Sequence, residues 1–223
     1  SVKNDPNAVQ ALIEHYMAAD SEAKSPYYII SVLQGADLPN REQVFANLAQ
    51  RLAAQGNSLS QAKLLHLVSS TGLQESFPEA TNMITDIALY ANTDTKLYAL
   101  DLLMPYQLDG NQKYAVLSDL KQSLNSLDED QRSYAIEHIM RFSDASEREQ
   151  MANDYLSTVN DLNTRIAVLS SLHSGTLAPS ETLKTQLFTI AKDSSDPLSR
   201  HAKHALMNVF DINNDEYQAL KTP

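Results

Sequence analysis

The chain has 223 residues, of which 43 % are hydrophobic, so it is long enough to bury a sizeable core and is not a disordered tail. Its 17 basic and 28 acidic residues give a formal net charge of −11, which argues against nucleic acid and anionic lipid as partners. A protein or peptide of basic character suits this surface better. The absence of cysteine excludes disulfides, thiolate nucleophiles and cysteine-ligated metals.

Helices are predicted along the whole chain, because apolar residues recur at three- and four-residue spacing, as in Val44, Leu48 and Leu52. The alternation typical of strands is missing, and no apolar run approaches the roughly 18 residues that a membrane-spanning helix needs. In chain order, the predicted helices cover 7–20, 26–36, 39–55, 58–71, 78–92, 94–104, 111–126, 128–142, 145–158, 161–174, 179–192 and 195–210.

Proline and glycine mark the ends of these helices. Five prolines fall where apolar periods begin: Pro26, Pro39, Pro78, Pro179 and Pro197. Pro105 is an exception, and it predicts that the helix from Asp94 kinks or stops near Met104. Glycines fall where apolar periods end and a left-handed residue is favoured; they are Gly35, Gly56, Gly72, Gly110 and Gly175. The short connections predict antiparallel helix hairpins without a linker between domains.

A repeat of about 34 residues runs through the chain. The first helices of successive hairpins begin near residues 39, 78, 111, 145 and 179. The second helices read "DTKLYALDLLM" (94–104), "DQRSYAIEHIM" (130–140), "NTRIAVLSSL" (163–172) and "LSRHAKHALM" (198–207). Each has a basic residue two or three places before an alanine, and these alanines are Ala99, Ala135, Ala167 and Ala202. A small residue at a fixed place lets the next hairpin approach closely, so stacked hairpins share one core.

The segment "SSDPLSRHAKHALMNVF" (194–210) resembles the second helix of a HEAT repeat in its Asp-Pro opening, following arginine and Ala-x-x-Ala-Leu ending. The resemblance extends over 78–210, with departures: Lys96 replaces the arginine, and no proline precedes Arg132 or Arg165. It implies an α-solenoid whose second helices line a concave face and serve in scaffolding or protein binding.

The fold class that follows is all-α, a right-handed α-solenoid of about six antiparallel helix hairpins of the HEAT type. Another array of α-hairpins is the alternative. We expect a single domain over 1–223, with more divergent hairpins over 1–77, the clearest repeats over 78–210 and a C-terminal cap over 211–223.

Polar positions on the second helices are the candidate partner-binding residues. Overlaying the repeats on their alanines puts Tyr98 and Tyr134 in one column, and Asp101 and Glu137 in a second column three residues later. Arg141 lies one turn further along. A concave face with these groups would present aromatic and acidic side chains from adjacent repeats to a peptide.

The alternative for these columns is solvated surface, or tyrosines packed between hairpins. The third repeat favours it, because Ile166 and Leu169 take the two positions there. In the last repeat the same positions hold His201 and His204, and Lys203 lies between them, so this hairpin has a basic second-helix face.

Metal sites are not predicted. The two histidines of the last repeat could share a helical face, but no third ligand is evident. The segment "DINNDEYQALKT" (211–222) begins like a calcium loop, yet Glu216 and Thr222 stand where the loop needs glycine and glutamate. We expect instead that Asn213 or Asn214 caps a short terminal helix.

Catalytic residues and cofactors are not predicted either. The sequence holds no Gly-x-Ser-x-Gly elbow and no phosphate-binding glycine loop, and the carboxylates of "DED" (128–130) are explained by capping of a helix. We therefore expect a non-catalytic protein-binding or scaffold module that uses the second-helix face. The alternatives are an enzyme or small-ligand carrier on the same scaffold, and an architectural segment of a larger assembly.

The location of the protein is indicated by composition alone. The chain begins at Ser1 without a basic and then apolar leader, is rich in Asn, Gln, Ser and Thr, and has few lysines. Together with the absence of cysteine, this favours an exported, periplasmic protein of a bacterium over a cytoplasmic one.

Overall fold

The computed structural model describes residues 5–20, 25–158, 161–172, 180–210 and 212–221. All regular secondary structure in these ranges is helical, so the predicted all-α class is confirmed. Contacts between helices divide the chain into two compact units, Ser1–Asp109 and Gly110–Pro223; the single domain expected from the sequence stays a prediction. Within the described ranges, no helix is both long enough and apolar enough to cross a membrane.

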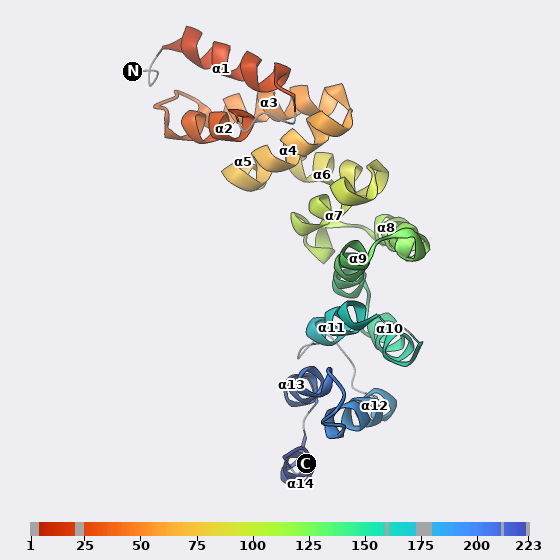
Figure 1. The fold of residues 1–223 in the computed structure, drawn as a ribbon. Coiled ribbons are helices and arrows are strands. Elements are labelled where there is room, and N and C mark those ends of the chain that lie inside the picture. The colour runs from red at the N-terminus through yellow and green to blue at the C-terminus, as the bar shows by residue number, and fades with distance from the viewer. Residues whose placement is uncertain (1–4, 21–24, 159–160, 173–179, 211, 222–223) are drawn as a thin grey trace. The chain divides into compact units, whose positions relative to one another are not determined.

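The N-terminal unit consists of helices that pack in successive pairs (Figure 1). Its elements are α1 (Pro6–Ala18), α2 (Ser25–Gly35), α3 (Arg41–Gln55), α4 (Ser58–Thr71), α5 (Leu73–Ser76), α6 (Glu79–Tyr90), α7 (Thr93–Asp101) and the 3-10 turn η2 (Pro105–Gln107). The pairs are α1 with α2, α3 with α4, and α6 with α7. The second members also contact one another, α2 with α4 and α4 with α7.

The C-terminal unit repeats this arrangement. Its elements are α8 (Gly110–Ser123), the 3-10 turn η3 (Leu124–Ser126), α9 (Glu129–Phe142), α10 (Ala145–Thr158), α11 (Leu162–Ser171), α12 (Glu181–Lys192), α13 (Ser199–Val209) and α14 (Asn214–Ala219). The helices α8 and α9, α10 and α11, and α12 and α13 form pairs. In Figure 1 the second helices α9, α11 and α13 follow one another in a row, and α11 contacts both of its neighbours.

The predicted helices coincide one by one with the α-helices from α1 to α13, apart from the short α5. The interruption predicted at Pro105 is confirmed, because α7 ends at Asp101 and the proline opens η2 instead of continuing the helix. The short helix predicted after residue 212 is also confirmed. Asn213 and Glu216 form a capping box at the start of α14, in which each side chain accepts the other residue's N–H.

The glycine prediction is correct at two positions, correct in part at a third and wrong at a fourth. Gly56 and Gly72 end α3 and α4 with φ of +63° and +64°, a left-handed conformation that a side chain would strain. Gly35 is the last residue of α2 but does not have a left-handed φ, and Gly110 opens α8 rather than ending α7. Before Gly110 the chain passes through η2 and the extended residue Leu108, so this glycine does not follow directly on the end of α7. Gly175 lies outside the described residues.

Four of the second helices begin at an amide or carboxylate side chain. In each, the side-chain oxygen accepts a hydrogen bond of 2.9 to 3.1 Å from the main-chain N–H three residues further on. These caps are Asn57 for α4, Asn92 for α7, Asp128 for α9 and Asp161 for α11. A side-chain cap satisfies one of the N–H groups that a helix start leaves without a partner, so it fixes where the helix begins.

The alanines of the repeat belong to the core, as the sequence pattern predicted. Ala99, Ala135 and Ala202 expose none of their surface, and Ala167 exposes 4 %. Each is followed directly by, or lies close to, a buried aliphatic residue of the same helix, such as Leu100 in α7. The buried side of each second helix therefore combines a small alanine with larger aliphatic side chains next to it.

Two of the four basic residues before those alanines donate hydrogen bonds to main-chain carbonyls of the preceding helix or turn. Arg132 in α9 donates from Nε to the carbonyl of Leu124 at 3.1 Å and from Nη2 to the carbonyl of Leu127 at 2.9 Å. Lys96 in α7, which is 4 % exposed, donates to the carbonyl of Leu89 near the end of α6 at 3.5 Å. A cation at a helix end binds carbonyls that have no partner within the helix.

Lys63 makes the same interaction from α4 to the end of α1. Its Nζ donates to the carbonyls of Tyr16, Met17 and Ala19 at 2.7, 3.1 and 2.5 Å, and the lysine is 5 % exposed. In return the Tyr16 hydroxyl donates to the Lys63 carbonyl at 2.9 Å. Burial lowers the pKa of the ammonium, against the opposing effect of the Asp20 charge. The buried cation is thus balanced by main-chain oxygens.

Replacing Lys63 by methionine should lower the free energy of unfolding by about 2 kcal/mol, because three charge-assisted hydrogen bonds are lost while the apolar stem is kept. Urea unfolding followed by circular dichroism measures this. Lys113→Met on α8 is the matched control, since no hydrogen bond of Lys113 is found within the described ranges. A loss at Lys63 no larger than that at Lys113 would contradict the capping role.

Candidate functional site

The predicted partner-binding residues of α7 and α9 lie on the outer faces of these helices. Asp101 and Glu137 are exposed, and Tyr98 and Tyr134 are 39 % and 38 % exposed. Arg141, in the last turn of α9, is exposed and lies over the Phe142 ring, 4.9 Å from its centroid. Each of the two units therefore presents one tyrosine and one carboxylate of the predicted strip on a second helix.

Both tyrosines are held on one side by neighbouring groups. The Tyr98 hydroxyl lies 3.1 Å from Ser69 Oγ, a contact that joins α7 to α4. The Tyr134 ring meets the buried ring of His138 edge to face, with 4.8 Å between the centroids. Anchored aromatic rings that remain accessible lose little conformational freedom when they bind a partner.

An acidic residue also lies one turn before each tyrosine, which the sequence overlay did not include. Asp94 precedes Tyr98 and Asp130 precedes Tyr134 by four residues, and both aspartates are exposed. Residues four and three apart share a helical face, so α7 and α9 each carry an acid, a tyrosine and a second acid in line. We call these two sets the acid–tyrosine triplets: Asp94, Tyr98 and Asp101 on α7, and Asp130, Tyr134 and Glu137 on α9.

On α11, the exposed position that corresponds to Asp101 and Glu137 lies one residue further along the helix than the alanine overlay placed it. Counted from the N-caps, Asp101 and Glu137 share a position that Ser170 holds in α11, and Ser170 is exposed. Leu169, which the alanine overlay placed there, is 2 % exposed and belongs to the core. The alanine of α11 lies one residue closer to its cap than those of α7 and α9, so aligning the alanines shifted this helix.

Some basic residues of α13 are exposed, and others are half-buried. His204 is exposed and lies 3.0 Å from the side-chain amide of Asn208, while His201 and Lys203 are half-buried. Arg200 is exposed on the first turn. The helix α11, which contacts both α9 and α13, carries one charged residue, Arg165, and this residue pairs with Asp196 at 3.9 Å. It lies between α9, with its exposed acids, and the basic α13. Within the described ranges, no three side chains of His, Asp or Glu come together as metal ligands would.

A pair of carboxylates links the starts of α9 and α11. A protonated Glu129 carboxyl donates a hydrogen bond to Asp161, and Asn163 donates from Nδ2 to Glu129 Oε1. The hydrogen bond to Asp161 and the Asp161 charge raise the pKa of Glu129. Burial acts to raise the pKa of Asp161, but hydrogen bonds from Thr164 and Glu129 outweigh it and lower that pKa. The sequence showed each acid only as part of a helix start, because they lie 32 residues apart in the chain.

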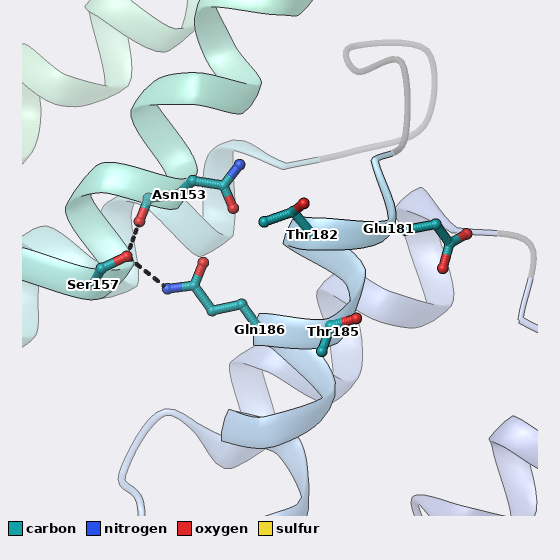
Figure 2. Close-up of a pocket in the computed structure, with 6 residues that line it drawn as sticks. All are labelled: Asn153, Ser157, Glu181, Thr182, Thr185 and Gln186. Carbon is teal, nitrogen blue, oxygen red and sulfur yellow. Dashed lines mark hydrogen bonds between the residues drawn. The ribbon is translucent and has the colours of Figure 1, made fainter.

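A shallow depression of about 600 Å³, open to solvent, lies between α10 and α12 (Figure 2). Its lining consists of hydroxyl, amide and carboxylate side chains: Asn153, Ser157, Glu181, Thr182, Thr185 and Gln186. Gln186 donates to Ser157 Oγ at 3.1 Å, and Ser157 donates to the Asn153 carbonyl. The lining is nearly uncharged and has no aromatic side chain, so it matches ordered water better than a recognised ligand.

No family model, curated protein or solved structure matches this chain.

Replacing Glu129 by glutamine should raise the melting temperature at neutral pH, because the amide supplies an N–H donor towards Asp161 and removes the repulsion between two charges. The raised pKa of Glu129 means that the folded chain binds this proton more tightly than the unfolded chain does. The wild type therefore loses stability as pH rises through the folded pKa, and its difference from the variant shrinks as pH falls.

Melting curves from pH 4 upwards, read as calorimetric midpoints, test this. Glu181→Gln is the matched control, because Glu181 is also the first residue of a helix, α12. Equal midpoints of Glu129→Gln and wild type at neutral pH, or a gap that widens towards acid, would show that the two carboxyls do not interact.

Proposed function

We propose that this chain is a HEAT-like α-solenoid of about six antiparallel hairpins, and that it serves as a non-catalytic module that binds a protein or peptide through its second helices. The packing within each unit supports this arrangement. In the N-terminal unit α4 contacts α7, and in the C-terminal unit α11 contacts α9 and α13, so second helices follow one another as they do in a helical repeat.

The observation that carries the proposed binding face is the repeated acid–tyrosine triplet. The spacing from acid to tyrosine to acid is four and then three residues on both α7 and α9. Helix packing needs only the buried flank, where Ala99 and Ala135 lie, and the helix dipole favours an acid in the first turn, where Asp94 and Asp130 stand. Neither of these requires the tyrosine or the second acid of each triplet. A combination that recurs on that face in both units is a pattern that recognition of a partner explains.

The partner that fits these triplets is a segment rich in arginine or lysine. Carboxylates form charge-assisted hydrogen bonds with such side chains, and the face of a tyrosine ring attracts a cation within about 6 Å of its centroid. The net charge of −11 attracts basic segments from a distance and raises their rate of association.

The basic residues of the C-terminal unit favour one direction of a bound peptide along this face. Lys203, His201 and His204 lie on α13, and Arg141 on α9, so an acidic residue of the partner is favoured next to its basic stretch in the C-terminal unit. A partner aligned in the opposite direction would place like charges together, which costs affinity. The recognised segment is therefore basic, with an acidic residue at one end.

Selection from a random peptide display library should enrich sequences with net positive charge, and the Tyr134→Ala, Glu137→Lys double variant should bind them at least about tenfold more weakly. The loss follows from removal of the ring and reversal of one charge. Fluorescence anisotropy with a selected peptide measures the affinity, and circular dichroism checks that helicity is retained.

Tyr114→Ala on α8 and Tyr90→Ala on α6 are the matched controls, because these tyrosines are 76 % and 81 % exposed but lie on first helices. The Tyr98→Ala, Asp101→Lys pair tests the N-terminal unit in the same way. Enrichment of neutral or acidic peptides, or equal losses in triplet variants and controls, would overturn the proposed face.

A further inference from the structure

A cavity of about 580 Å³ lies in the N-terminal unit between α1 and the start of α3. One wall is a stripe of α1, and the other is formed by the connection from α2 to α3 and the first turn of α3. Its apolar lining residues are Pro6, Val9, Ile13, Leu38, Pro39 and Val44. Its size lies within the range of cavities that hold small organic ligands.

The α1 wall is fixed at both ends. At the N-terminal end, Asp5 accepts the N–H of Asn7 at 2.9 Å through its side chain and the N–H of Val9 at 3.1 Å through its carbonyl. At the C-terminal end, Lys63 binds the last carbonyls of the helix. The exposed Arg51–Glu14 ion pair, at 3.0 Å, joins α3 to α1 as well.

The opposite wall is held by contacts between α2 and α3. Arg41 donates from Nη1 to the carbonyl of Gln34 at 2.6 Å, which joins the start of α3 to the end of α2. Asn40 turns the chain in the left-handed conformation at φ 59°, and its carbonyl accepts the N–H of Val44 at 3.1 Å. Both walls are therefore set before a ligand arrives, which limits the entropy lost on binding.

The chemistry of the lining is apolar with an acidic rim. Six of its nine residues are aliphatic or proline, and the two charged ones, Asp5 and Asp37, are both exposed aspartates. No lysine, arginine or histidine contributes to the lining. Such a cavity favours a ligand that has an apolar body and a positive charge at one end.

We propose that this cavity binds an organic cation, an amine or guanidinium carried on an apolar body, with the body between α1 and α3 and the charge at the rim beside Asp37. The cavity shares no residue with the acid–tyrosine triplets, so it is a separate site. Its test does not depend on the proposed partner-binding face. Its ligand is either a free small amine or a basic side chain next to an apolar one in a peptide.

Hexylamine, 1-hexanol and hexanoate each have an apolar chain and differ in charge. Comparing their binding therefore separates the contribution of the apolar body from that of the positive charge. In ¹H–¹⁵N spectra of the full chain, hexylamine should shift amides of α1 and the first turn of α3, and bind several-fold more tightly than 1-hexanol, with hexanoate weakest. Equal shifts with hexylamine and 1-hexanol, or shifts that avoid both walls, would overturn the proposal.

Variants test the same assignment from the protein side. Asp37→Asn should weaken hexylamine two- to fivefold and leave 1-hexanol unchanged, whereas Leu38→Gln should weaken both. Asp86→Asn, an exposed aspartate of α6 in the same unit, is the matched control and should change neither. An effect of Asp37→Asn no larger than that of Asp86→Asn would overturn the role of the rim.

Blocked peptides distinguish the two sources of the cation. A Leu-Arg-Leu peptide that binds more tightly than hexylamine, and loses affinity when arginine becomes glutamine, identifies a basic segment of a protein as the ligand. Tighter binding of hexylamine than of the peptide identifies a free amine. Absence of shifts on α1 with both probes would overturn the site altogether.

Discussion

The arrangement of the second helices depends on basic side chains that bind main-chain carbonyls where an earlier helix ends. Lys63 reaches from α4 to α1, Lys96 from α7 to α6, and Arg132 from α9 to the turn after α8. The carbonyls at a helix end lack partners within the helix, and a cation there is favoured by the helix dipole. Together with the side-chain caps at their own starts, these contacts fix three second helices along their axes relative to the segment that precedes each of them.

Much of the fold could be predicted from the sequence, because helix periodicity and helix ends are local properties. The stop before Pro105 and the left-handed Gly56 need no knowledge of distant residues. The prediction that failed is that of Gly110, which opens α8 after η2 and the extended residue Leu108 instead of ending a helix. Leu169 is buried, in agreement with the core position that its apolar side chain favoured in the third repeat.

The residues of the candidate sites could likewise be predicted only in part from the sequence. Tyr134 and Glu137 were found from the sequence because the repeat itself aligns them, and the structure adds Asp130 by showing that it is exposed on the same side of α9. The contact between Glu129 and Asp161 joins residues far apart in the chain, so no spacing could indicate it. The cavity beside α1 likewise combines residues 5–13 with 37–44, and its acidic rim is a product of folding.

The central claim is that the outer faces of the second helices bind a basic partner, and amide hydrogen exchange measures that face directly. Exchange rates of the chain alone and with a selected basic peptide should differ on α7 and α9, where the acid–tyrosine triplets lie, with slower exchange in the complex. The first helices α6, α8 and α10 should keep their rates. Slower exchange confined to the first helices, with α7 and α9 unchanged in the saturated complex, would contradict the account.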